Sequence, residues 1–290
     1  MPPPSPTMEP PPESLPSGPV APARRRVLPF DPRRDGFAFP NTFRWTAADL
    51  DHLGRELRPL LRGLAVAVPA AVGAGLRGRR GLVAGAGLGA LAGLLRVPEA
   101  GVARIARRWS SFGLCGGMAL AAAERWPHRG AGLETAALQP SFVRALLRRR
   151  QAAALRAAWP QFLRWWLRAL AARGEPLAAA ADLEAEVDRL RARLDAGRPA
   201  VVGLAGDAPD PFSLHQVVAF GYEEEGAVTT FLVYDPNAPG RTRHLRAWTA
   251  DGRAHVATDL PTGPKGRRGY HIHRTPGRVA MLFAVEADEG

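Results

Sequence analysis

The chain has 290 residues, 46% of them hydrophobic, and a formal net charge of +12 at pH 7. This length can bury one good core and leaves room for an appended helical segment. Such a charge is typical of proteins that bind nucleic acid, but the basic residues here are scattered arginines with few aromatic residues among them. We therefore expect no nucleic-acid partner.

Only one cysteine, Cys115, is present, which excludes an intramolecular disulfide. His271 and His273 alternate along an expected strand, but no third residue with metal-ligand spacing accompanies them. A glycine-rich phosphate loop is also missing from the sequence. The N-terminus lacks the charged start and apolar core of a signal peptide. These features predict a cytoplasmic protein that holds neither a metal nor a cofactor.

The first 106 residues are expected to form a tail followed by a helical segment. Residues 1–40 begin with a stretch dominated by proline, serine and glutamate, and we expect them to be disordered. Residues 41–106 are expected to be helical, beginning where Thr46 and Asp49 form an N-cap pattern for a helix that ends near Arg62.

Two apolar pieces separated by an arginine-rich linker make up residues 63–95. Neither piece reaches the length of about 20 apolar residues that a membrane-spanning helix needs. The second piece has a glycine at every fourth position, namely Gly81, Gly85, Gly89 and Gly93. Such a bare face suits close helix packing. We favour a soluble helix pair, and the alternative is a hairpin that associates with a membrane.

Cys115 lies between small residues, in residues 112–118, directly before the helix-forming run of residues 119–126. A thiol in the first turn of a helix is exposed to unpaired N–H groups and to the positive end of the helix dipole, which favour the thiolate. The flanking glycines would let a substrate backbone approach. The alternative is a small, buried apolar side chain. Ser110 and Ser111 are candidate N-caps of this helix.

A long helical block is expected over residues 141–194, kinked at Pro160. Its last part, residues 182–194, is expected to be a short charged helix that ends before Gly197. Pro199 then leads into a short buried strand. Further strands are expected at residues 242–248, 269–273 and 279–285, because apolar and β-branched runs there are separated by glycine and proline turns. These strands would complete an antiparallel sheet.

His215 opens an apolar, β-branched run, and Asp235 ends a second run that Pro236 stops. Residues 223–226 between the two runs predict a hairpin turn. Because the start of one strand in an antiparallel hairpin lies beside the end of the other, the hairpin would bring His215 next to Asp235. Taken alone, each would be an ordinary histidine or an ordinary turn residue.

A cysteine that opens a helix, followed by a histidine and an acid on strands, resembles the papain-like cysteine peptidases, and most of all their bacterial relatives of the bacteriocin-leader-processing type. Three segments carry the resemblance: residues 112–118, 194–204 and 215–240. It implies that Cys115 is the nucleophile, His215 its base and Asp235 the group that orients the imidazole, with Asn237 as the alternative orienter.

One departure from the family concerns the oxyanion. Such enzymes usually place a glutamine six residues before the cysteine, and here that position is Trp109. The indole N–H of Trp109, Ser110 or Ser111 could substitute for it. An oxyanion donor contributes roughly 10²- to 10³-fold in rate, so its loss would slow turnover and leave the attack possible.

The sequence thus predicts an α+β protein with three parts. Residues 1–40 are the tail, residues 41–106 the helical segment, and residues 107–290 a papain-like domain in which the helix bearing Cys115 packs on an antiparallel sheet bearing His215 and Asp235. Three functions are compatible with this organisation. They are a cysteine-dependent hydrolase or acyl transferase for a peptide or protein substrate, a papain-like binding module, and a membrane-associated effector that uses residues 63–95.

Overall fold

The computed structural model describes residues 24–44, 46–49, 111–128, 135–172, 180–205, 215–260, 278–279 and 281–286. The chain divides into two compact units. One consists of Met1–Asn41 together with Leu114–Gly290, and the other of Thr42–Gly113. The first unit therefore begins at Leu114 after the interruption, several residues later than the boundary expected at residue 107, and it includes the N-terminal segment.

The larger unit has the α+β composition that the sequence predicts. Its helices are α4 (Cys115–Arg125), α5 (Pro140–Ala172) and α6 (Ala180–Asp195), with short 3₁₀ turns at Trp126–His128 and Thr135–Ala137. Its strands are β1 (Arg25–Val27), β4 (Ala200–Ala205), β5 (His215–Glu225), β6 (Val228–Tyr234), β7 (Thr242–Ala250), β8 (Arg253–Thr258), β9 (Arg278–Val279) and β10 (Met281–Ala284).

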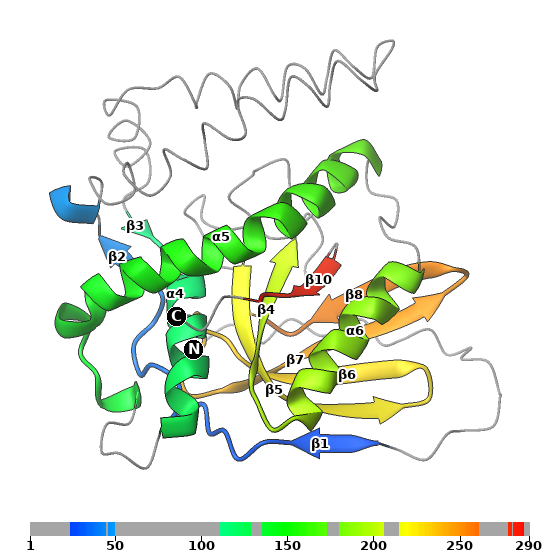
Figure 1. Cartoon of the computed structure of the whole chain (residues 1–290), viewed down its shortest axis with the longest axis horizontal. Helices are drawn as coiled ribbons and strands as arrows, with labels where there is room; N and C mark the ends of the chain where they lie inside the picture. The colour runs from blue at the N-terminus through cyan, green and yellow to red at the C-terminus, as the bar shows by residue number, and fades with distance from the viewer. Residues whose placement is uncertain are drawn as a thin grey trace, which may run out of the picture. The chain divides into compact units, whose positions relative to one another are not determined.

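These strands form one sheet in which every pairing is antiparallel (Figure 1). The order is β10-β4-β5-β6-β7-β8-β9, and β1 pairs with β5 beside this path. Strand β5 is central, because Val218 lies opposite Val201 of β4 and Tyr234 of β6. The first five residues of β5 pair with β4, and β1 pairs with the part that follows the bulge between Ala219 and Gly221.

The strand predictions need one correction and one addition. The β5–β6 turn consists of Gly226, at a φ of 57°, and Ala227, whereas residues 223–225 belong to β5 and not to the turn. Positive φ favours glycine, which explains why the turn forms at Gly226. Strand β8 was not predicted. The expected strand at residues 269–273, with His271 and His273, lies outside the described residues.

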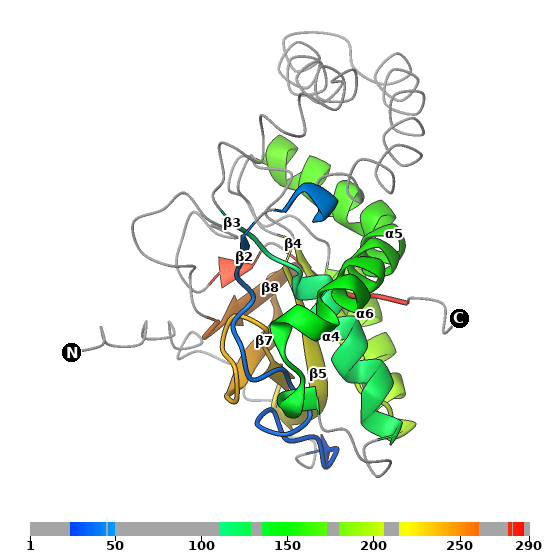
Figure 2. The same cartoon turned by 90° about the vertical axis from the view of Figure 1, so that its left-hand side faces the viewer.

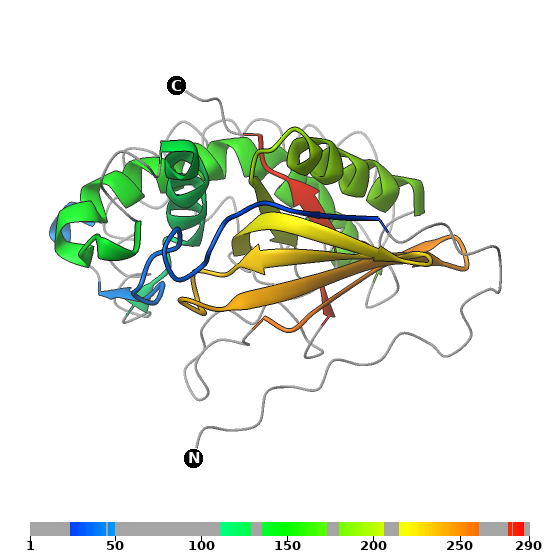
Figure 3. The same cartoon turned by 90° about the horizontal axis from the view of Figure 1, so that it is seen from below.

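The helices α4, α5 and α6 lie on the same side of the sheet (Figure 3). Gly116 and Gly117 allow α4 to approach its neighbours closely. A Cβ atom on Gly117 would lie 2.2 Å from the carbonyl oxygen of Leu147 in α5. A Cβ on Gly116 would lie 2.6 Å from Oε1 of Gln216 in β5. The expectation that these glycines admit a substrate backbone is therefore wrong, since they face α5 and β5.

Helix α5 continues through Pro160, where a kink is expected, to Ala172, and α6 is a separate helix, as expected for the charged run of residues 182–194. The fully buried side chains of α5 follow the helical period and include two alanines: Val143, Leu147, Ala154, Ala158, Phe162 and Trp165. Helix α6 ends as predicted before Gly197, which has a φ of 76°. Strand β4 follows at the predicted place, after Pro199.

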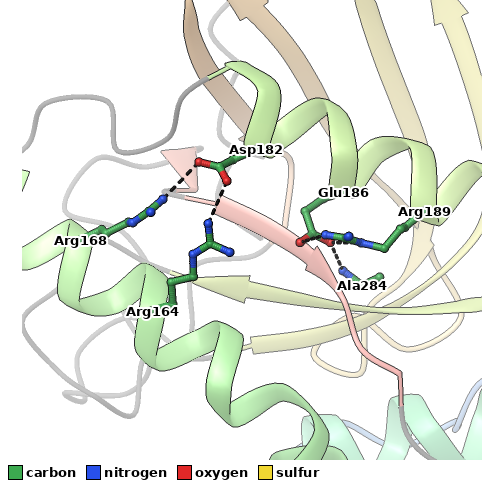
Figure 4. A network of polar contacts seen from close by, with 6 residues as sticks. All are labelled: Arg164, Arg168, Asp182, Glu186, Arg189 and Ala284. Atoms are coloured by element: carbon green, nitrogen blue, oxygen red, sulfur yellow. Dashed lines mark hydrogen bonds and ion pairs between the residues drawn. The ribbon is translucent and has the colours of Figure 1, made fainter. Parts of the chain in front are cut away.

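Polar contacts attach α6 to both α5 and β10 (Figure 4). Asp182 accepts hydrogen bonds from Arg164 at 2.9 Å and from Arg168 at 3.1 Å. One turn further on, the buried Glu186 accepts from the backbone N–H of Ala284 at 3.0 Å and pairs with Arg189. Because a buried carboxylate must have hydrogen-bond partners, Glu186 fixes where α6 meets β10.

Residues 24–40 are not a disordered tail. Strand β1 pairs with β5, and the N–H of Leu28 donates to the carbonyl of Phe220 at 2.8 Å. The ring of Phe30 stacks on that of Phe220, with 5.2 Å between centroids. Figure 2 shows this segment, in blue, running along the sheet. Leu28, Phe30 and Phe37 are buried because the fold offers them apolar surface, which a disordered tail would not have.

In the smaller unit, β2 (Phe43–Arg44) pairs with β3 (Ser111–Phe112). The predicted N-cap is present, since the Thr46 hydroxyl donates to Oδ2 of Asp49 at 2.6 Å and the Asp49 N–H returns a bond of 3.3 Å to the Thr46 hydroxyl. The rest of that helix and the predicted helix pair at residues 63–95 lie outside the described residues. Within the described part of the chain, no helix has the length and hydropathy needed to cross a membrane.

Candidate functional site

Cys115 is the first residue of α4. The helix forms because small and helix-favouring residues follow the cysteine, and its first nine residues are buried against the sheet and α5. The thiol therefore lies at the positive end of the helix dipole, as the sequence predicts. Its side chain is 8% exposed.

The start of α4 is capped by side chains from elsewhere in the fold. The N-cap residue Leu114 makes no side-chain cap. Instead, Oδ1 of Asn41 accepts the N–H of Leu114, and Oε1 of Gln151 accepts the N–H of Gly117 at 2.8 Å. Ser111 lies in β3 and not at the N-cap, so the expected serine cap is wrong at this position. Ser110 and Trp109 lie outside the described residues.

His215 and Asp235 meet where the sequence places them. His215 is the first residue of β5, and Asp235 directly follows the last residue of β6. Because β5 and β6 are antiparallel, these two ends are adjacent. Nε2 of His215 lies 2.7 Å from Oδ1 of Asp235, and the two residues are 4% and 0% exposed.

Burial lowers the pKa of His215, but the negative charge of Asp235 and its hydrogen bond act in the opposite direction, as does a hydrogen bond with the side chain of Cys115. Together these contacts raise the pKa of His215 to about 10. The imidazole is therefore held protonated between a carboxylate and a sulfur. Since Nε2 faces Asp235, Nδ1 is the nitrogen available to the thiol.

Asn237 lies beside this pair without replacing Asp235. Its backbone N–H donates to Oδ1 of Asp235 at 2.8 Å, and its side-chain nitrogen Nδ2 is 3.4 Å from Nε2 of His215. The shorter contact of the ring is with the carboxylate. Of the two candidate orienters, Asp235 is thus the direct partner of the imidazole, and Asn237 supports the carboxylate.

Sequence reasoning missed Asn41 and Gln151. Both are ordinary polar residues in the sequence, and neither lies in a pattern that relates it to the cysteine. Only their hydrogen bonds to the start of α4 reveal their role. Arrangements of this kind, with a thiol at a helix N-terminus, an imidazole and a fixed acceptor, are suited to nucleophilic attack on a carbonyl carbon.

In the described ranges, no group of three or more His, Cys, Asp or Glu side chains could hold a metal ion. Comparisons of the chain with protein-family models, with curated proteins and with solved structures found no match.

Proposed function

We propose that this protein is a papain-like cysteine-dependent hydrolase or acyl transferase that acts on a peptide or amide bond. One observation carries the proposal: the buried imidazole of His215 has two partners. Its Nε2 lies 2.7 Å from Oδ1 of Asp235, and the side chain of Cys115 is a further hydrogen-bond partner. A structural histidine in a core needs one partner. A second partner that is a thiol at a helix N-terminus favours a chemical role.

In the proposed reaction, the thiolate of Cys115 attacks the carbonyl carbon of the substrate, and a C–S bond forms. The imidazolium of His215 gives its proton to the leaving nitrogen as the C–N bond breaks, which leaves a thioester. Water then attacks the thioester, His215 accepts its proton, and the acid and the free thiol are released. Asp235 holds the ring throughout and stabilises its positive charge whenever the ring is protonated.

The developing oxyanion requires donors. The N–H groups of Cys115 and Gly116 lie in the first turn of α4, where a helix supplies no intrahelical acceptor. They are the donors that we propose in place of the family's glutamine, whose position Trp109 occupies. We propose a cytoplasmic peptide or protein as the substrate, following the resemblance to the leader-processing peptidases.

The proposal is tested with p-nitrophenyl acetate, an activated ester that reports thiol acylation by release of p-nitrophenolate. We expect the native protein to acylate Cys115 and to turn over, and Cys115→Ala and His215→Ala to abolish both steps. The matched control is His244→Ala, because His244 also pairs with an acid, Asp259, at 3.0 Å, but on strand β7. Acylation that is independent of His215 would refute the proposal.

The near-complete burial of the site favours a second candidate, a papain-like binding module. Cys115 is 8% exposed and Asp235 is fully buried, so a substrate has little direct access to either side chain. In this case Cys115 would react slowly with p-nitrophenyl acetate, and replacing His215 would make no difference. The third function, a membrane-associated effector, depends on residues 63–95, and liposome flotation of the full chain against one lacking these residues tests it.

A further inference from the structure

Asn41 is hydrogen-bonded to both halves of the site. Its side-chain oxygen accepts the N–H of Leu114, the residue before the cysteine. Its side-chain nitrogen donates to Oδ1 of Asn237 at 3.2 Å, and its backbone N–H donates to the carbonyl of Pro236 at 3.0 Å. Asn41 is buried, so these bonds are shielded from water.

These contacts determine the orientation of two amides. A backbone N–H can only donate, so the atom of Asn41 that faces Leu114 is the oxygen, and Nδ2 must face Asn237. Nδ2 can only donate, so Asn237 must offer it Oδ1. The remaining group of Asn237, its own Nδ2, is then the one directed at His215, 3.4 Å from Nε2.

This orientation excludes Asn237 as an acceptor for the imidazole. An amide oxygen turned toward Nε2 would compete with Asp235 for the same ring proton, and a neutral acceptor stabilises an imidazolium less than a carboxylate does. With Oδ1 held by Asn41, Asp235 is the acceptor that faces Nε2, at 2.7 Å.

We propose that Asn41 is a positioning residue of this site: it keeps Asn237 turned so that Asp235 accepts the ring proton of His215, and it fixes the start of α4 against the Asp235–Asn237 turn. The inference rests on the proposed function. Asn41 does not touch the reacting atoms in this role, since it acts through Leu114 and Asn237.

The test uses Asn41→Asp in the full chain. The new carboxylate still accepts the N–H of Leu114 but cannot donate to Asn237, so Asn237 must turn its Nδ2 toward residue 41 and its Oδ1 toward His215. Asp235→Ala alone should slow the alkylation of Cys115 by iodoacetamide at pH 6 by about 10- to 100-fold, because the ring loses its acceptor. Adding Asn41→Asp should restore at least part of this loss.

A third substitution distinguishes this mechanism from a direct electrostatic effect of the new carboxylate on the imidazole. If the rescue runs through the amide of Asn237, it disappears when Asn237→Ala is added. If the charge of the new carboxylate acts through space, the rescue persists, and the proposal is overturned. Absence of any rescue overturns it as well.

A second measurement needs no change at Asp235. In the otherwise native chain, Asn41→Leu and Asn237→Ala should each slow alkylation, and the double variant should be no slower than the slower single variant. Full additivity would contradict action through Asn237. Phe30→Leu is the control, because it weakens the packing of the same segment on Phe220 and leaves the Asn41 bonds in place. It should lower the Tm and leave the alkylation rate unchanged.

Failure of the proposed function gives a different result. If Cys115 of the native protein reacts slowly and His215→Ala makes no difference, the site is not an activated thiol, and both proposals fall. Rapid, His215-dependent alkylation that is insensitive to Asn41 overturns only the role of Asn41.

Discussion

His215, the first residue of β5, is held in its charged form by Asp235, which directly follows β6, and by Cys115 of α4. Its burial alone would favour the neutral ring, but the charge and hydrogen bond of Asp235, together with the smaller effect of Cys115, more than reverse this preference. Removing one partner of a buried ion pair typically destabilises a protein by about 3–5 kcal/mol. We therefore expect the pair to contribute to stability as well as to chemistry.

The raised pKa of His215 predicts how stability depends on pH. The folded protein binds a proton that the unfolded chain releases above its ordinary pKa of about 6.5. The stabilisation of the folded state by this proton is therefore complete below pH 6.5 and is lost as the pH rises toward about 10. In this window the free energy of unfolding should fall by up to about 1.4 kcal/mol per pH unit.

Urea unfolding of Cys115→Ala at several pH values measures this slope. Cys115 is replaced because a proton that passed from its thiol to the ring of His215 would leave the number of protons bound by the protein unchanged. The pKa of His215 should stay raised without the thiol, because Asp235 makes the two largest contributions that raise it. Adding His215→Gln should remove the slope, whereas His244→Gln should retain it. An equal slope in all three variants would contradict the protonated state of His215.

At the scale of elements, the position of the cysteine depends on how closely α4 packs against α5 and β5. Gly117 faces the backbone of Leu147, which cannot move aside easily. Gly116 faces the end of the Gln216 side chain, which is flexible. The two glycines are adjacent in one helix, so they form a matched pair for measuring this packing.

We expect Gly117→Ala to destabilise the protein by roughly 1–3 kcal/mol, because the added methyl group overpacks the contact with Leu147. Gly116→Ala should cost less, since the closest atoms to its added Cβ are side-chain atoms of Gln216 and Ala154 and not backbone, and alanine favours the helix by about 1 kcal/mol over glycine. Chemical denaturation of both variants gives the comparison. Equal loss at the two positions would show that backbone contact is not what limits the approach of α4.

The ends of the helices and strands can be predicted from this sequence better than the faces that they bury. The sequence indicated α5, α6, β4, β5, β6 and β7 at nearly their observed places. Phe142, a large apolar residue in the first turn of α5, is nevertheless 85% exposed, and Val143 one residue later is buried. Since α4 approaches α5 through glycines, a side chain as small as that of Ala154 suffices at this interface, and hydrophobic size alone does not identify the buried face.

At the scale of the whole molecule, residues 24–41 are part of the sheet unit and reach the site. The N–H of Leu28 is bonded to Phe220, the N–H of Phe37 donates to the buried Tyr234 hydroxyl at 3.0 Å, and Asn41 reaches Leu114. Burial of Tyr234 raises the pKa of its hydroxyl, which keeps it neutral and able to accept. The segment thus joins strand β5 to the start of α4.

Hydrogen exchange tests this arrangement. The amide of Leu28 should exchange about as slowly as the amides of β5, because the hydrogen bonds of both break only when the sheet opens. Phe30→Ala should lower the protection of Leu28 and the overall stability, by about 3–5 kcal/mol for a buried phenylalanine. Exchange of Leu28 at the rate of an unstructured peptide would show that the segment detaches independently.

By itself, the sequence determined the α+β composition, the place of the cysteine at a helix start and the meeting of His215 with Asp235. Those features are local, since a hairpin of about 20 residues, with a turn at Gly226, brings its own ends together. Only the tertiary structure decided that α4 lies against β5, so that a thiol 100 residues before the histidine helps to raise the pKa of its ring. It also decided that Asn41 and Gln151 cap that helix and that β1 joins the sheet. Contacts between distant segments depend on which faces pack together, and local sequence patterns carry little information about this.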